Sequence, residues 1–283
     1  MAHPLPSFEV PPVTEVVVSS RFRPSEAYNL MSAAALAEWA RDRGFPVIEE
    51  RPGYEAPAEQ FGAVAPTNSV SLELLSGPPP MRYWFQNASG DELLQLQPNW
   101  VAANWRKVAP TAAYGRWDSR WDAFAAWARQ VEAVLGPGKP LEHEQVEVTY
   151  VNHIEGRGVW TSHGEAASVF SFLASSADLT DGFLTQPETS TCELHFIIPG
   201  DEGGDPIGRL YVTVSPAFKR PTNEPIFVMN LTARGRPTSG GLDGVRQFAE
   251  IAHEWIVRSF SDLTTERMHR AWHRIDDDQG GTT

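Results

Sequence analysis

Two histidine–glutamate pairs are the residues of this chain best suited to acid–base chemistry. Glu147 and His153 lie in the run EQVEVTYVNHIE, and Glu193 and His195 lie in the run TCELHFII. A histidine titrates near neutral pH, and with a carboxylate beside it the imidazole can act as a general base. Cross-strand pairing without chemistry is the commoner role for such residues. The sequence therefore marks a candidate site and leaves both interpretations open.

A metal site is not expected at the C-terminal histidines. His269 and His273 are four residues apart in a stretch that favours a helix, so they would share one helix face. Two ligands do not complete a metal site, and no third one follows at a suitable spacing. Cationic neighbours also repel a metal ion, and they are Arg267, Arg270 and Arg274.

Familiar catalytic motifs are missing from the sequence. His253 and Glu254 begin like HExxH, but Val257 stands where the second histidine belongs. The run GDEGGDPIG at 200–208 lacks the lysine of a phosphate loop and predicts a hairpin turn. We expect no catalytic residue and no cofactor, which favours a protein that is not an enzyme. His253 itself is expected near the core or in a helix contact.

Three alternating segments predict strands with one apolar and one polar face. The apolar residues expected under helices are Leu94, Leu96, Val148, Cys192, Leu194 and Phe196. The polar residues expected on the other face are Gln95, Gln97, Glu147, Thr149, His153, Glu193 and His195. Such groups can hydrogen-bond a ligand or a partner, whereas a plain solvated face is the simpler alternative. Cys192 is expected to be a small buried hydrophobe.

The elements that position these residues are arranged twice along the chain. Each half opens with a β-rich run, continues through alternating strands and closes with an amphipathic helix, at 117–135 and at 243–263. Short antiparallel strands with segregated helices predict an α+β fold of two similar half-domains. Each half is expected to be a curved antiparallel sheet backed by its long C-terminal helix. The expected divisions are an extended N-terminal arm at 1–12, half-domains at 13–138 and 139–275, and a disordered tail at 276–283.

Local signals predict the remaining elements. Helices are expected at 30–43 and 166–174, with a further helical stretch at 264–275. The predicted strands span 13–22, 47–50, 70–75, 82–86, 93–97, 144–155, 191–198, 208–215 and 226–233.

Composition limits the classes of partner. The chain of 283 residues has 23 basic and 36 acidic side chains, giving a formal net charge of −13. This charge opposes binding to nucleic acid and to anionic membranes, and it suits a basic protein partner. The first twelve residues lack the features of a signal peptide, and one cysteine excludes an internal disulfide. We therefore expect a cytoplasmic protein.

Several segments together resemble a sporadically distributed, functionally uncharacterised bacterial protein family. They include LLQLQPNWVAANWRK at 93–107, VEVTYVNHI at 146–154 and HEWIVRSFSDLTTERMHRAW at 253–272, of which NWRK and TYVNHI are the most specific. The resemblance implies a domain type and no activity. It places in the family pattern Asn104, Trp105, Arg106, Asn152 and His253. A buried arginine needs a partner, so Arg106 is expected to meet a carboxylate or a carbonyl, while Trp105 is expected to anchor the core.

Two functions follow as expectations. The first is a protein-binding or regulatory module, in a defence or toxin-neutralising setting. The alternative is a small-molecule-binding protein or an enzyme with a site between the halves. The candidate binding residues are Gln95, Gln97, Arg106, Glu147, His153, Glu193 and His195. The order of elements also resembles the saddle-like TATA-binding fold, an analogy that carries no function.

Overall fold

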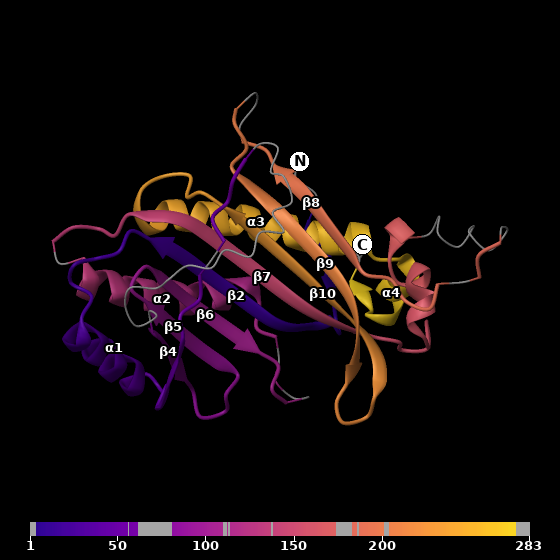
Figure 1. Ribbon diagram of the computed structural model, residues 1–283, viewed down its shortest axis with the longest axis horizontal. Coiled ribbons are helices and arrows are strands. Elements are labelled where there is room, and N and C mark those ends of the chain that lie inside the picture. The colour runs from indigo at the N-terminus through magenta and orange to yellow at the C-terminus, as the bar shows by residue number, and fades with distance from the viewer. Residues whose placement is uncertain are drawn as a thin grey trace, which may run out of the picture.

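One large antiparallel sheet with helices on one side forms the centre of the molecule. The computed structural model describes residues 4–55, 57–61, 81–109, 112, 114–136, 138–173, 183–185, 187–200 and 204–275. The sheet strands are β2 (Val13–Phe22), β3 (Val47–Pro52), β4 (Met81–Gln86), β5 (Glu92–Gln97), β6 (Trp100–Arg106), β7 (His143–Glu155), β8 (Cys192–Ile198), β9 (Gly208–Lys219) and β10 (Glu224–Gly235). The expected α+β class is confirmed (Figure 1).

The strand order is β3-β4-β5-β6-β2-β7-β10-β9-β8, and every neighbouring pair is antiparallel. Outward from the central β2–β7 pair, the order is β6, β5, β4, β3 on one side and β10, β9, β8 on the other. The expectation of a separate sheet in each half is therefore wrong. Because β2 and β7 are long and pair along most of β2, they join all nine strands into one sheet.

Three helices pack on one face of this sheet. They are α1 (Leu30–Asp42), α2 (Trp117–Leu135) and α3 (Gly241–Leu263). Helix α2 lies against β6 and β2, and α3 lies against β7 and β10, while α1 packs on α2 and the outer strand β4 (Figure 1). None of the helices in the described part of the chain combines the length and apolarity that a bilayer crossing requires.

Helix burial follows the apolar periodicity of the sequence. In α2 the buried side chains include Trp121, Phe124 and Ala128, and in α3 they include Phe248 and Ala252. These positions recur every three or four residues, so each helix turns one stripe towards the sheet. Together with the inward-facing strand residues they form a single hydrophobic core.

The first and the last strand that the structure describes pair with each other beside α3. Residues Ser7–Phe8 (β1) pair with Arg274–Ile275 (β11), next to the short helix α4 (Glu266–Ala271). The Phe8 ring meets Phe260 and Trp272 edge-on, with centroids 5.8 Å away in both cases. The expected N-terminal arm is thus held against the C-terminal segment where it is described.

Some predicted elements differ from the structure. Strand β6 was not predicted because its first half, Trp100 to Ala103, is apolar at every position and so hides the alternation, although Asn104 and Arg106 lie on the polar face. The helix expected at 166–174 is a short 3-10 helix, η1 (His163–Ser168). The strand expected at 70–75 and the tail at 276–283 lie outside the described residues.

Candidate functional site

The polar face of the sheet is the face opposite the helices, and it carries the predicted site residues. The alternation of Gln95, Gln97, Glu147, His153 and His195 is confirmed, since their strand partners are the other polar-face positions. The exposure expected for the two glutamines is wrong, because Gln95 is only 4% exposed and Gln97 only 3%. Both lie on β5, which has strands on either side of it in the sheet.

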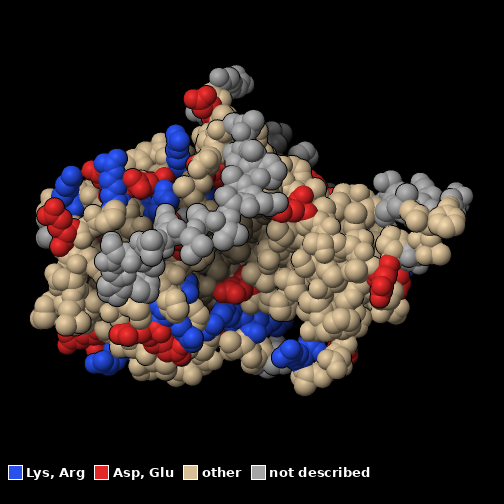
Figure 2. All heavy atoms as spheres, viewed as in Figure 1, with Lys and Arg blue, Asp and Glu red and all other residues tan. Residues whose placement is uncertain are grey.

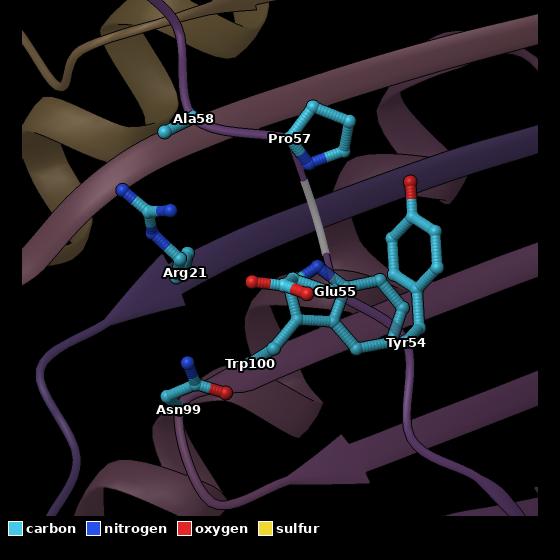
Figure 3. Close-up of a pocket in the computed structure, with 7 residues that line it drawn as sticks. All are labelled: Arg21, Tyr54, Glu55, Pro57, Ala58, Asn99 and Trp100. Atoms are coloured by element: carbon cyan, nitrogen blue, oxygen red, sulfur yellow. The ribbon is translucent and has the colours of Figure 1, made fainter. Parts of the chain in front are cut away.

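A segment without regular structure covers Gln97. Residues 53–55 and 57–61, here called the crossing segment, run over the polar face of β5, β6, β2 and β7 (Figure 3). The Gln97 amide donates to the Tyr54 carbonyl oxygen over 2.8 Å and accepts from the Tyr54 backbone N–H. In the same way Gln145 donates to the Pro57 carbonyl over 3.0 Å and accepts from the Glu59 N–H over 2.9 Å. Two glutamine side chains therefore hold an extended backbone across the sheet.

Gln95 belongs to a buried polar chain. Its amide donates to Asn104 over 2.7 Å, and the Asn104 amide donates to Glu15 over 2.8 Å. The indole N–H of Trp127 from α2 donates to the backbone carbonyl of Gln95 over 3.0 Å. The amide nitrogens of Gln95 and Asn104 are thus paired within the protein, which gives Gln95 a structural role, whereas its Oε1 is buried without a hydrogen-bond partner.

Glu147 lies in an ion-pair network on the second half of the polar face. It accepts from Arg234 over 2.6 Å, and the Arg234 guanidinium lies 5.0 Å from the ring centroid of Tyr211. Tyr211 donates to Glu59 of the crossing segment over 2.6 Å, and Arg209 pairs with the same carboxylate at 2.5 Å. This network ties the end of the crossing segment to β9 and β10.

The two candidate histidines share a face but not a site. His195 pairs with Tyr211 of β9. Tyr211 pairs with Thr232 of β10, which in turn pairs with Thr149 of β7. His153 is therefore three strands away, about 14 Å across the sheet, and four residues further along β7. His195 bonds Glu193 of its own strand at 2.9 Å, and both side chains are exposed. The two imidazoles are therefore too far apart to act together as one general acid–base site.

Cationic and aromatic side chains meet on the first half of the polar face. The guanidinium carbons of Arg51, Arg82 and Arg106 lie 4.7, 5.3 and 5.9 Å from the ring centroid of Trp84. Figure 2 shows Lys and Arg side chains gathered in a band across the lower part of this view. Of this group only Arg106 was predicted from the sequence, although the alternation in MRYWFQ places Arg82 and Trp84 on one side of a strand.

Arg106 has the carbonyl partner that was expected for it. Its Nη2 donates to the backbone oxygen of Gly90 over 3.0 Å. Trp105, the next residue, points to the opposite face, where it is 3% exposed and packs beside Tyr114. The expectation that Trp105 anchors the core is confirmed.

A hollow of about 380 Å³ lies under the crossing segment. Strands β2 and β6 contribute Arg21 and Trp100, and Tyr54 packs edge-on against the Trp100 ring at 5.7 Å (Figure 3). The Nε of Arg21 is buried without a hydrogen-bond partner, and the nearest carboxylate oxygen, from Glu144, is 3.8 Å away. The hollow therefore combines an aromatic wall with a poorly satisfied cation. The lining residues are Arg21, Tyr54, Glu55, Pro57, Ala58, Asn99 and Trp100.

A polar network on the helix side joins the two halves of the sheet. Tyr150 of β7 shares hydrogen bonds with Tyr114 at 2.8 Å and with Nδ1 of His253 at 3.0 Å. Trp117 at the start of α2 stacks on His253 of α3, with ring centroids 4.5 Å apart. Burial lowers the pKa of His253 to about 4, so the ring is neutral at pH 7. The expected helix contact of His253 is confirmed.

Comparisons with known proteins identified no relative of this chain. No protein-family model, no curated protein and no solved structure matches this chain. The resemblance to the sporadically distributed bacterial family therefore stays a prediction, and the function has to be inferred from the site itself.

Proposed function

We propose that this protein is a binding module that recognises an extended polypeptide through the polar face of its sheet. The observation that carries this proposal is the paired bonding of the crossing segment by Gln97 and Gln145. A glutamine amide presents one donor side and one acceptor side, as a peptide group does. A face that holds its own chain by backbone bonds has the chemistry needed to hold another extended chain.

The dispersal of the titratable groups also favours binding over catalysis. General base catalysis requires a base within hydrogen-bond reach of a substrate and oriented by a third group. His153 and His195 are on separate strands, and Glu147 is already paired with Arg234. The exposed residues of the second half, His195 and Glu193 among them, offer hydrogen bonds to a partner without forming a catalytic pair between halves.

Site-directed photo-crosslinking tests the proposal. A benzophenone amino acid replaces His153 or His195 on the polar face, and in the control it replaces Arg129, which is exposed on α2. After irradiation in cells, we expect discrete polypeptide adducts from positions 153 and 195 and none from 129. Equal adducts from all three positions, or no polypeptide adduct from the polar face, would contradict the proposal.

We also propose that the two halves arose by duplication, with a saddle-like arrangement of their strands. One row of paired residues on the helix side supports this interpretation, because it has the same residue types in mirrored order. From β4 to β8 the row is Phe85, Leu94, Ala103, Val18, Val148, Ala233, Leu210 and Phe196.

The helices support the duplication independently. Phe124, Ala125 and Ala128 are buried in α2, and Phe248, Ala249 and Ala252 are buried in α3 with the same spacing. Superposition of β2, β6 and β5 with α2 onto β7, β10 and β9 with α3 tests the idea. We expect the mirrored residues to coincide, and a displacement of the helices by a full turn would contradict the duplication.

The hollow under the crossing segment favours a second candidate function, the binding of a small molecule, although its lining residues all belong to the first half and do not form a site between the halves. Its volume of about 380 Å³ is in the range of small-ligand sites. Native mass spectrometry of the purified protein tests this alternative. A bound compound that is lost in Trp100→Ala but kept in Trp39→Ala would favour this function, since Trp39 lies on α1 outside the hollow. If the wild-type protein shows only the mass of its own chain, with no bound compound, the result would count against it.

A further inference from the structure

The arginines of the polar face differ in their carboxylate partners between the two halves. In the second half, Arg234 pairs with Glu147 at 2.6 Å and Arg209 pairs with Glu59 at 2.5 Å. In the first half, Arg82 and Arg106 form no ion pair with any residue that the structure describes. Arg51 of the same cluster pairs with Glu49. A partly buried cation without a counter-charge is costly, so Arg82 and Arg106 are the arginines that lack the carboxylate partner their counterparts have.

Several hydrogen-bond donors of the cluster also lack an acceptor. Within the described ranges, the Nε atoms of Arg82 and Arg106 and the indole Nε1 of Trp84 are buried and have no acceptor. Buried donors are nearly always paired, and each unpaired one costs free energy. Two of these donors lie beside the Trp84 ring and the third belongs to it. Their grouping indicates that a ligand from outside the chain supplies the missing acceptor.

The geometry restricts the ligand. The Arg82 guanidinium lies between two rings, 5.3 Å from the Trp84 centroid and 5.8 Å from that of Tyr54, while Arg51 is 4.7 Å from Trp84. Stacked guanidinium groups keep their planar edges available, and these edges fit the paired oxygens of a carboxylate or phosphate. Three guanidinium groups around one ring favour an anionic ligand over a neutral aromatic one.

We propose that Arg82, Arg106 and Trp84 form an oxyanion-binding site that takes a carboxylate or a phosphate group. Burial, together with the charge of nearby Arg51, lowers the pKa of Arg82, so its surroundings disfavour the charged form. The site goes beyond the proposed polypeptide binding and does not depend on it, since a small anion suffices to occupy it.

Isothermal titration of the full chain at constant ionic strength tests the site. The two probes are inorganic phosphate and tricarballylate, a small tricarboxylate, and sodium chloride balances the salt. We expect at least one probe to bind, and the affinity to fall about tenfold or more in Arg82→Gln and in Arg106→Gln, because each change removes a charge-assisted hydrogen bond. The probe that binds more tightly shows whether the site prefers a phosphate or a carboxylate group.

The matched control is Arg43→Gln. Arg43 also stacks on a tryptophan, with its guanidinium carbon 4.1 Å from the Trp39 ring, but it is exposed at the end of α1 and away from the polar face. Its loss should leave probe affinity unchanged. Arg82→Lys, which keeps the charge, and Trp84→Phe, which removes the indole N–H, cover the possibility that a glutamine variant does not fold; each should weaken binding several-fold. Failure of both probes to bind the wild-type protein, or equal affinities in the Arg82, Arg106 and Arg43 variants, would overturn the site.

Discussion

Strands β4 and β8 hold corresponding places on the two sides of the central β2–β7 pair, yet their surroundings differ. Phe85 of β4 is 1% exposed, whereas Phe196 of β8 is 37% exposed, although both end the same mirrored row. Helix α1 packs against β4, and the described part of the chain places no comparable helix over β8. The same residue in the same strand parity is therefore buried or exposed according to what covers its strand.

The polar sides of these strands differ in charge as well. Where β4 presents Arg82 and Trp84, β8 presents Glu193 and His195 at the corresponding steps from its phenylalanine. The first pair belongs to a cationic cluster, and the second forms its own exposed hydrogen bond of 2.9 Å. If the halves arose by duplication, their polar sides have taken on different roles while the helix side kept its residue types.

The largest expected effect compares the two phenylalanines. Phe85→Ala should lower the free energy of unfolding by about 3–5 kcal/mol, because it leaves a cavity in a closed core. Phe196→Ala should cost about 1 kcal/mol or less, since the side chain is already partly in water. Urea unfolding curves of both variants measure the difference. Similar losses would show that β8 is covered in solution and would break the comparison.

The second prediction concerns acid stability and uses two partly buried histidines, one on strand β7 and one on helix α3. Burial lowers the pKa of His143, which contacts Ser20 and Phe22, and that of His253 in α3, both to about 4. A histidine whose pKa is lowered on folding takes up a proton on unfolding, so its contribution is present above about pH 6.5 and is lost as the pH falls towards 4. Each histidine should contribute a slope of at most about 1.4 kcal/mol per pH unit in this window.

Urea midpoints at pH 7, 5.5 and 4.5 check this dependence. We expect the wild-type protein to lose stability on acidification, and the slope to become shallower in His143→Gln and again in His253→Gln. An unchanged slope in the double variant would refute the assignment to these two rings.

The third prediction compares Gln97, which holds the crossing segment over the first half of the polar face, with a residue at the corresponding position in the second half. Gln97→Ala should cost about 1–3 kcal/mol, because it breaks both bonds to Tyr54 and leaves buried backbone groups unpaired. Thr213→Ala, at the corresponding step of β9, should cost less than about 0.5 kcal/mol. Limited proteolysis should also cut the crossing segment faster in Gln97→Ala than in Thr213→Ala. Equal proteolysis rates would mean that Gln97 does not hold this segment.

The smallest expected effect is an absence of binding. Although the first half of the polar face is locally cationic, the formal net charge of −13 opposes the counterion release that drives nucleic-acid binding. A mobility-shift titration at physiological salt should show no appreciable complex with DNA or RNA. Tight, salt-sensitive binding that Arg82→Gln abolishes would show that the local charge outweighs the net charge.

The sequence by itself determined the local elements and the side to which each residue points. Alternation placed Leu96, Val148 and Phe196 on one face and Gln97 and His195 on the other, because side chains of a strand alternate whatever the strand packs against. The steps of three and four likewise predicted α2 and α3 to within two residues of their observed ends. Strand β6 was not predicted because its first four residues, Trp100 to Ala103, are all apolar and show no alternation.

Only the tertiary structure decided what covers each face. Periodicity carries no information on whether a helix, a loop or water lies over a residue, so it predicted burial for exposed Phe196 and exposure for buried Gln97. The joining of both halves into one sheet and the meeting of Arg82 and Arg106 around Trp84 depend on contacts between distant strands. Such contacts come from the packing of the whole chain, and a local pattern of residue types does not specify them.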